Sequence, residues 1–165
     1  MESTHKAVFF DRDGTINSDI GHYYIYKEED FVFNPKVIEN MKRLYDAGYI
    51  LFVVTNQGGV AKGLYSCDDV EKLHSFMLEK LSAAGVYIKD IFYCPHHESV
   101  KKCECRKPSP FFINKAIEDY QLDRNNCYFI GDGDRDIQAA EAAGIIGYKI
   151  EKNTDFSYII DKILK

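Results

Sequence analysis

The stretch KAVFFDRDGT, residues 6–15, decides the fold, because a short apolar run there leads directly into a polar turn. Residues 6–10 predict a strand that is buried on both faces, and Gly14 permits a sharp turn after it. The turn places the carboxylates of Asp11 and Asp13 at the tip of that strand. Aspartate and glycine are also ordinary turn residues, so this stretch alone leaves both a functional and a purely structural interpretation open.

Four more short apolar runs follow along the chain, with helical patterns between them. The predicted strands are residues 6–10, 50–55, 91–93, 127–130 and 147–150, and the predicted helices are residues 35–47, 66–84, 110–120 and 134–143, with a terminal helix within 152–165. This alternation predicts right-handed crossovers and an α/β fold with a doubly wound, Rossmann-like parallel sheet. The connections are too short for a large cap domain, so we expect a single domain over residues 1–165 with an open active site.

Composition limits the partners of the chain. Its 165 residues, 45% of them hydrophobic, are enough for one substantial core. The 21 Lys and Arg against 26 Asp and Glu give a net charge of -5, which argues against nucleic acid or an anionic membrane as partner. No long apolar run and no signal-type N-terminus is apparent, so we expect a cytoplasmic protein, and no obvious amphipathic dimerisation helix is present, which favours a monomer.

Polar segments that follow the predicted strands are the candidates for chemistry, because ligands of doubly wound sheets bind at the carboxyl ends of the strands. Residues 55–59, TNQGG, offer a hydroxyl and backbone amides to phosphate oxygens. Arg106 and Lys107 offer two cations. Residues 131–136, GDGDRD, supply carboxylates that suit Mg²⁺. Taken singly, each segment is also explained as a loop, a solvated surface or a helix cap.

Together, in this order and at successive strand ends, the segments DRDGT, TNQGG, RKP and GDGDRD resemble the haloacid dehalogenase superfamily of phosphohydrolases. The resemblance implies that Asp11 attacks phosphorus to form an aspartyl-phosphate. It implies that Asp13 protonates the leaving alkoxide and then activates water. Thr55 and Lys107 would hold the transferring phosphoryl group.

The same resemblance implies a Mg²⁺ site. Its ligands would be the carboxylate of Asp11, the backbone carbonyl of Asp13 and Asp132, with Asp136 supporting them from outside. The metal and Lys107 would together keep Asp11 ionised, so that it attacks near neutral pH.

Cys94, His96, Cys103 and Cys105 form a second candidate metal site, which comes from a single loop. Three thiolates and an imidazole suit a closed, tetrahedral Zn²⁺ site, which indicates a structural role for the zinc. His97 is an alternative ligand, and His96 is favoured because CPH…CxCRKP resembles the zinc loop of one family branch. Reduced cysteines without metal are the alternative for the whole cluster.

The longer motifs FFDRDGTIN, TNQGGVAKG, CPHH…CECRKP and IGDGDRDIQAA resemble the branch of heptose bisphosphate and histidinol phosphate phosphatases. The resemblance implies hydrolysis of the 7-phosphate of D-glycero-D-manno-heptose 1,7-bisphosphate, with histidinol phosphate as the alternative substrate. The short zinc loop is nearer the histidinol phosphatase length, whereas the lack of a second enzymatic domain favours the heptose. The implied substrate contacts are Asp19, Ile20, Gly21, His22, Asn56, Gln57, Gly58 and Lys62, with Arg106 recognising the remote phosphate.

Two other functions remain as alternatives. Polynucleotide 3'-phosphatases share TNQ and RKP, but the net charge and the zinc loop count against that activity. A non-catalytic, zinc-stabilised binding module needs no full set of catalytic residues, and this chain has that set.

Overall fold

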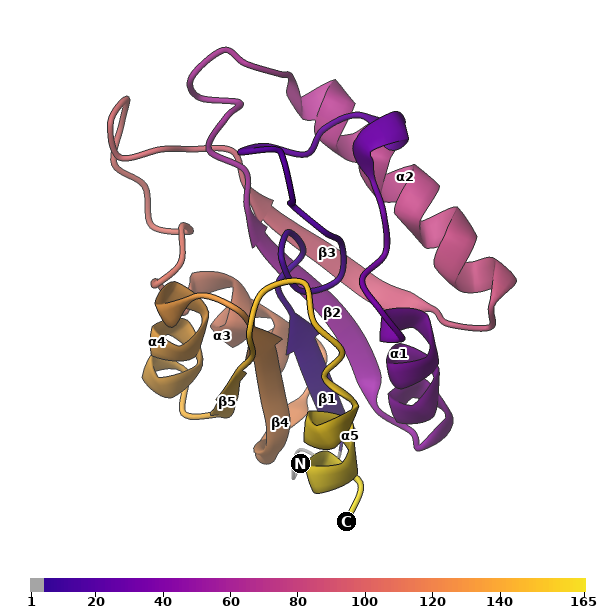
Figure 1. The fold of residues 1–165 in the computed structure, drawn as a ribbon. Coiled ribbons are helices and arrows are strands. Elements are labelled where there is room, and N and C mark those ends of the chain that lie inside the picture. The colour runs from indigo at the N-terminus through magenta and orange to yellow at the C-terminus, as the bar shows by residue number, and fades with distance from the viewer. Residues whose placement is uncertain (1–4) are drawn as a thin grey trace.

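Five parallel strands form one sheet in the order β3-β2-β1-β4-β5 in the computed structural model, which describes residues 5–165 (Figure 1). The strands are β1 (His5–Phe10), β2 (Ile50–Asn56), β3 (Ile88–Cys94), β4 (Leu122–Gly131) and β5 (Ile146–Lys149). The chain starts in the middle of the sheet, builds one side through β2 and β3, and then returns to build the other. This order confirms the predicted doubly wound α/β fold.

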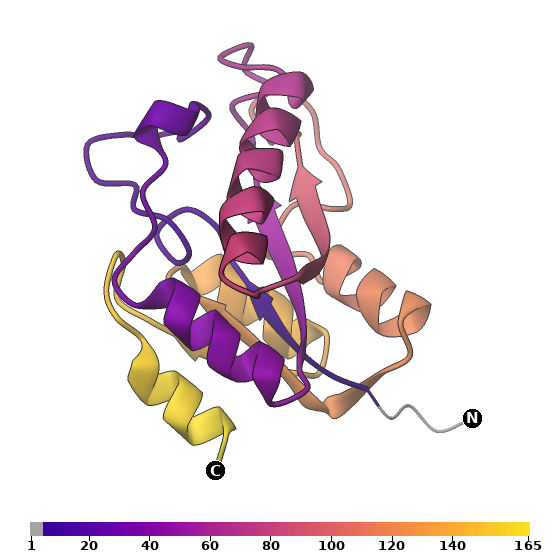
Figure 2. The same ribbon diagram turned by 90° about the vertical axis from the view of Figure 1, so that its right-hand side faces the viewer.

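Helices cover both faces of the sheet (Figure 2). They are α1 (Val37–Asp46), α2 (Cys67–Ala83), α3 (Phe111–Asp119), α4 (Asp134–Ala142) and α5 (Ser157–Ile163), with a short 3₁₀ turn at Glu28–Asp30. Apolar residues of α1, α2 and α5 pack in one core cluster, and those of α3 and α4 pack in another. Among residues 5–165, no helix has the length and apolar character needed to cross a membrane.

The central strand β1 contributes to both cores. Val8 and Phe10 belong to the cluster under α1, α2 and α5, whereas Ala7 and Phe9 belong to the cluster under α3 and α4. All four residues are fully buried. This explains why the strand is a continuous apolar run rather than an alternating one.

Local signals set several helix boundaries. Ser66 and Asp69 form a reciprocal capping box at the start of α2, with hydrogen bonds of 3.1 Å and 2.9 Å. Gly48, Gly85 and Gly144 follow α1, α2 and α4 with positive φ angles, as expected for helix C-termini.

β4 is longer than predicted. It begins at Leu122 rather than near residue 127, and Leu122 pairs with His5 at the start of β1. The pairing register shifts between Leu122 and Cys127, and the exposed residues 124–126 lie within this irregularity, so no continuous apolar pattern indicates the start of the strand.

Strand register brings the polar segments together. Phe10 is level with Val53 of β2 and with Ile130 of β4. Asp11, Thr55 and Asp132, which come one or two residues later, therefore lie at the same edge of the sheet.

Candidate active site

Lys107 connects three elements at the centre of this edge. Its ammonium group donates to Asp11 Oδ1 at 2.9 Å, to Asp136 Oδ1 at 2.6 Å and to the carbonyl oxygen of Val54 at 2.8 Å. Only 3% of the Lys107 side chain is exposed. Its positive charge is therefore fixed between the ends of β1 and β2 and the start of α4.

Burial and charge act in opposite directions on the pair of Asp11 and Lys107. Burial, together with the nearby Asp136, raises the pKa of Asp11 well above its usual range, and Lys107 opposes this rise without cancelling it. Burial would lower the pKa of Lys107, but Asp11 and Asp136 raise it above its ordinary value. We expect Mg²⁺ and Lys107 together to keep Asp11 ionised, and Lys107 by itself is therefore insufficient.

Asp132 and Asp136 bring two further carboxylates to Asp11, and their ligand atoms lie within 4.8 Å of one another. Gly14 has a φ of +87°, and a Cβ there would lie 2.8 Å from Asp132 Oδ2, so this approach requires glycine. The hydroxyl of Thr15 donates to Asp132 Oδ1 at 2.9 Å. Burial and the nearby Asp136 raise the pKa of Asp132, and the hydrogen bond from Thr15 and the charge of Lys152 oppose this rise without cancelling it. The oxygen donors and their uncompensated charge fit a divalent cation such as Mg²⁺.

The carboxylate of Asp13 is held by a different set of residues. It accepts hydrogen bonds from Arg12 Nε at 3.0 Å, Arg12 Nη2 at 3.1 Å, Asn17 Nδ2 at 2.9 Å and Gln57 Nε2 at 3.2 Å. The hydroxyl of Tyr65 in turn donates to Gln57 Oε1 at 2.7 Å. These contacts fix the orientation of Asp13, as a general acid and base requires.

Arg12 and His74 support Asp13 from inside the protein, and the sequence interpretation assigned a role to neither. Arg12 is fully buried, and it donates to the carbonyl oxygen of Ile25 at 2.6 Å. Its Nη1 lies 3.1 Å from His74 Nε2, which must accept the hydrogen bond because arginine has no acceptor. Burial and the charge of Arg12 lower the pKa of His74 to about 3. In the sequence, the signal that could have indicated a role for Arg12 is its position between Asp11 and Asp13.

A cavity of about 270 Å³ lies over these groups. Thr55 lines it, and its Oγ1 accepts a hydrogen bond from Gln57 Nε2 at 2.9 Å. Asn56 is joined to the backbone of Lys107 by two hydrogen bonds, of 3.0 Å and 3.2 Å, which tie β2 to the segment before α3. The lining consists of Asp11, Asp13, Thr55, Asn56, Arg106, Lys107, Gly133, Asp134, Arg135 and Asp136.

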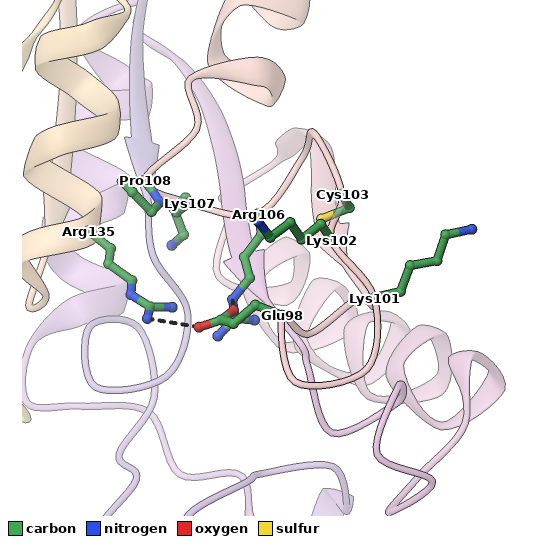
Figure 3. Close-up of a pocket in the computed structure, with 8 residues that line it drawn as sticks. All are labelled: Glu98, Lys101, Lys102, Cys103, Arg106, Lys107, Pro108 and Arg135. Atoms are coloured by element: carbon green, nitrogen blue, oxygen red, sulfur yellow. Dashed lines mark hydrogen bonds and ion pairs between the residues drawn. The ribbon is translucent and has the colours of Figure 1, made fainter.

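A second cavity, of about 230 Å³, shares Arg106, Lys107 and Arg135 with the first (Figure 3). Its remaining lining is Glu98, Lys101, Lys102, Cys103 and Pro108. We call the first the catalytic cavity and the second the distal cavity. The sequence interpretation did not assign Glu98 or Arg135 to a site.

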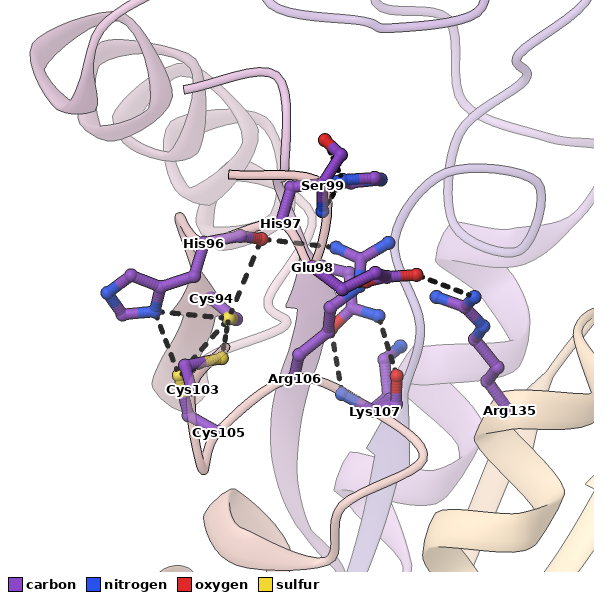
Figure 4. Close-up of polar contacts among 11 residues, drawn as sticks. Cys94, His96, His97, Glu98, Ser99, Cys103, Cys105, Arg106, Lys107 and Arg135 are labelled. Carbon is purple, nitrogen blue, oxygen red and sulfur yellow. Dashed lines mark hydrogen bonds and ion pairs between the residues drawn. The ribbon is translucent and has the colours of Figure 1, made fainter. Parts of the chain in front are cut away.

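Cys94, His96, Cys103 and Cys105 lie together at the base of the loop after β3 (Figure 4). The sulfur of Cys94 is 3.1 Å from that of Cys105 and 3.5 Å from that of Cys103, and the other sulfur pair is 3.8 Å apart. Nδ1 of His96 lies 3.5 Å from the Cys94 sulfur and 3.4 Å from the Cys105 sulfur. These separations approach the roughly 3.8 Å between sulfurs that share a tetrahedral Zn²⁺. Burial and the neighbouring Cys105 raise the pKa of Cys94, so a thiolate there needs a cation.

His97 points away from the sulfur cluster. Its Nδ1 lies 2.7 Å from the hydroxyl of Ser99 and accepts the backbone N–H of Ser99 at 3.1 Å. Of the two adjacent histidines, the structure therefore places His96 with the cysteines.

The residues expected to contact a sugar are not all at the cavity. Asn56 and Arg106 line it, whereas residues 19–22 do not. Gln57 is 1% exposed and hydrogen-bonds to other side chains of the site, so it supports the site from within. Gly58 lies against Arg106, because a Cβ at Gly58 would be 3.0 Å from Arg106 Nη1.

Asp19 and Lys62 have other neighbours. Asp19 pairs with Lys152 at 3.0 Å and accepts from Asn153 Nδ2 at 2.9 Å, which links the segment after β1 to the C-terminal region. The hydrogen bonds from Asn153 and Lys152 outweigh burial and lower the pKa of Asp19. The ammonium group of Lys62 lies 5.7 Å from the centre of the Tyr24 ring.

Comparison with known proteins identifies the family. Residues 6–162 match the family model described as polynucleotide kinase 3 phosphatase. The D-glycero-alpha-D-manno-heptose-1,7-bisphosphate 7-phosphatase of Photorhabdus laumondii is 41% identical over 146 residues, which are 85% of this chain and 79% of the relative. The D-glycero-beta-D-manno-heptose-1,7-bisphosphate 7-phosphatase of Haemophilus ducreyi is 42% identical, with the same coverage of 85% and 79%.

A solved structure agrees with these sequence relatives. D,D-heptose 1,7-bisphosphate phosphatase from B. bronchiseptica, complexed with magnesium and phosphate, superimposes with a TM-score of 0.86 and 26% identity. The match covers 96% of this chain and 98% of that one. The chain therefore belongs to the haloacid dehalogenase-type phosphatases, in the family that contains these heptose bisphosphate phosphatases.

Proposed function

We propose that the protein hydrolyses the 7-phosphate of D-glycero-D-manno-heptose 1,7-bisphosphate. The observation that carries the proposal is the contact between Asp11 and Lys107 at 2.9 Å, at the carboxyl edge of a sheet shared with heptose bisphosphate phosphatases. A carboxylate beside a fixed ammonium group can attack phosphorus while the cation holds a phosphoryl oxygen.

The residues act in two steps. Asp11 attacks phosphorus, the bond to the sugar oxygen breaks, and Asp13 gives its proton to the leaving alkoxide. Asp13 then takes a proton from water, which attacks the aspartyl-phosphate and releases inorganic phosphate with Asp11 regenerated. Thr55 and Lys107 hold the phosphoryl group in both steps, and the hydrogen bonds from Arg12 and Gln57 keep Asp13 oriented.

Mg²⁺ would be held by Asp11, the backbone carbonyl of Asp13 and Asp132. When bound, the ion supplies the positive charge that offsets repulsion between an anionic nucleophile and an anionic substrate. Asp136 is in contact with Lys107 and with the backbone N–H of Gly133, at 2.6 Å and 3.1 Å, so we assign it a supporting role.

Zn²⁺ would be held by Cys94, His96, Cys103 and Cys105, which are four protein ligands and leave no open position for water. The donor set therefore indicates a structural metal. It would fix the loop that positions Arg106, whose Nη1 donates to the carbonyl oxygen of His96 at 3.2 Å.

The test is phosphate release in Mg²⁺ from both anomers of the heptose 1,7-bisphosphate and from histidinol phosphate. Relatives named for either anomer match about equally well, at 41% for one and 42% for the other, so overall similarity does not select the anomer. We expect kcat/KM for one anomer to exceed that for histidinol phosphate by at least about 100-fold, since a site built for a second phosphate rejects a substrate without it. A preference for histidinol phosphate would overturn the substrate and leave the mechanism standing.

A second candidate is a polynucleotide 3'-phosphatase, which the description of the matching family model suggests. The acidic chain, with a net charge of -5, disfavours it. A 3'-phosphorylated oligonucleotide belongs in the same assay, and faster hydrolysis of it than of either heptose anomer would establish this alternative.

We also propose that the protein acts as a monomer on its small sugar substrate. One subunit supplies every residue of the mechanism described above, so activity needs no partner chain. Light scattering after gel filtration tests this proposal, and a dimer at assay concentration would contradict it.

A further inference from the structure

The distal cavity contains an ion-pair bridge made by residues from two different elements (Figures 3 and 4). Glu98, in the loop after β3, lies with Oε2 at 2.8 Å from Arg106 Nε and with Oε1 at 3.3 Å from Arg135 Nη2 at the start of α4. One carboxylate thus occupies the space between two guanidinium groups.

The cavity around this carboxylate is strongly cationic. Five of its eight lining residues are Lys or Arg, and Glu98 is the one acidic residue among them. The chain as a whole has a net charge of -5, so this concentration of positive charge is local. The position next to the catalytic cavity suits a second anionic group of the same substrate.

The bridge is weak on its Arg135 side. The side chains of Glu98 and Arg135 are each 50% exposed, and exposed ion pairs contribute little. Nε of Arg106 is buried and close to Glu98, yet within the described residues 5–165 it has no partner with hydrogen-bond geometry. A phosphate has more charge and more acceptor oxygens than a carboxylate, so it can satisfy both arginines better.

Arg106 does not depend on Glu98 for its position. Its side chain is 17% exposed, and Nη1 is bonded to the carbonyl oxygen of His96 at 3.2 Å. Gly58 leaves the space that the guanidinium occupies, because a Cβ there would lie 3.0 Å from Nη1. If Glu98 moves away, Arg106 therefore keeps its hydrogen bond to His96 and its packing against Gly58.

We infer that the distal cavity binds the remote phosphate of the substrate, its 1-phosphate, through Arg106 and Arg135. Glu98 is an exchangeable internal anion of that site. The inference rests on the proposed function. Glu98 occupies the arginine pair between turnovers, the remote phosphate of the bisphosphate displaces it, and it returns as the product leaves. The 1-phosphate product retains the remote phosphate, so competition from Glu98 weakens substrate and product binding alike and promotes product release.

The experiment compares Glu98→Gln and Arg135→Gln with wild type in Mg²⁺. It measures KM for the heptose 1,7-bisphosphate, the inhibition constant of the 1-phosphate product, and kcat/KM for p-nitrophenyl phosphate, which has one phosphate. Glu104→Gln is the matched control, since Glu104 is an exposed acid of the same loop with no ion pair within residues 5–165.

Glu98→Gln is expected to lower KM and the product inhibition constant together, by about two- to fivefold, since exposed ion pairs are of that strength. Arg135→Gln is expected to raise both constants about five- to tenfold, because it removes a charge-assisted contact to phosphate. Each change should be larger for the bisphosphate than for p-nitrophenyl phosphate, and Glu104→Gln should match wild type.

A higher KM in Glu98→Gln would overturn the inference, because Glu98 would then position the arginines rather than compete for them. Unchanged constants in Arg135→Gln would remove Arg135 from the site. In both cases a wild-type preference for the bisphosphate leaves the proposed function intact. A wild-type enzyme without that preference defeats the proposed function and this inference together.

Discussion

Asp11 and Asp13 are two residues apart, yet they lie in different chemical surroundings. Asp11 is next to Lys107, Asp132 and Asp136, and burial with these carboxylates raises its pKa. Asp13 instead accepts hydrogen bonds from uncharged amides and from Arg12. Neighbouring positions after one strand can thus serve as nucleophile and as acid/base group, because their side chains point into different networks.

The nucleophile is tested by Asp11→Asn. We expect kcat to fall at least about a thousandfold, because the amide is nearly isosteric but cannot act as an anionic nucleophile. Stability without Mg²⁺ should not fall, since burial already disfavours the charge of Asp11. The matched control is Asp46→Asn, an exposed residue that forms an ion pair with Lys42. Turnover within tenfold of wild type in Asp11→Asn would exclude the mechanism.

His74 predicts a specific loss of stability in acid. Its pKa is about 3 in the folded protein against an ordinary 6.5, so the unfolded chain binds a proton that the folded protein excludes. Stability from neutral His74 is therefore present above about pH 6.5 and is lost as pH falls toward 3. His74→Gln keeps an acceptor for Arg12 but cannot be protonated.

We expect the free energy of unfolding of wild type to fall by about 2 kcal/mol more than that of His74→Gln between pH 7 and pH 5. Urea titrations at several pH values measure this difference. Parallel curves for the two proteins would show that His74 is not neutral and buried next to Arg12.

At the scale of elements, the loop after β3 has two parts, a candidate metal site and a pair of cations, and they are adjacent in the sequence. The cysteines and His96 form its base, and Arg106 and Lys107 follow them directly into the two cavities. A loop this polar has little core of its own, as its exposed residues 98–102 show. A metal at its base would substitute for that core.

Cys103→Ser tests the metal loop. We expect bound zinc to fall from about one per chain to near zero, and Tm to fall by about 5–10 °C, because the metal contributes folding free energy. KM for the bisphosphate should rise more than kcat falls, since the loop positions Arg106 rather than Asp11. Cys67→Ser, an exposed cysteine outside the cluster, is the control. An unchanged metal content in Cys103→Ser would contradict the assigned ligands.

At the scale of the whole molecule, binding of Mg²⁺ should be visible as stability. The carboxylates of Asp11, Asp132 and Asp136 meet only in the folded sheet, so the ion binds the folded state far better than the unfolded chain. Mg²⁺ at about 100 times its dissociation constant should stabilise the protein by about 2.7 kcal/mol, which raises Tm by roughly 5–10 °C.

Asp132→Asn should lose most of this shift in a thermal unfolding experiment, and Mg²⁺-free buffer without a chelator, which leaves the zinc assigned to the loop after β3 in place, gives the baseline for both proteins. An equal shift in Asp132→Asn would place the stabilising Mg²⁺ at another site.

The sequence by itself determined the strand and helix alternation and the two-sided burial of β1, and it predicted which residues carry the chemistry. Apolar runs such as residues 6–10 and helix-ending glycines such as Gly48 report local structure directly, because their signals lie within a few residues. The start of β4 left no such signal, since Leu122 is separated from the apolar run at residues 127–130 by the exposed residues 124–126, where the pairing register shifts.

Only the tertiary structure decided which side chains meet. Lys107 contacts Asp11 across 96 residues and Asp136 across 29, and the placement of His96 rather than His97 among the cysteines depends on how the loop closes. The hydrogen-bond donors around Asp13 and the position of Glu98 between two arginines are likewise set by how the connecting segments pack on the sheet. Spacing along a chain fixes the period of an element, whereas contacts between elements depend on register and packing, which local sequence does not encode.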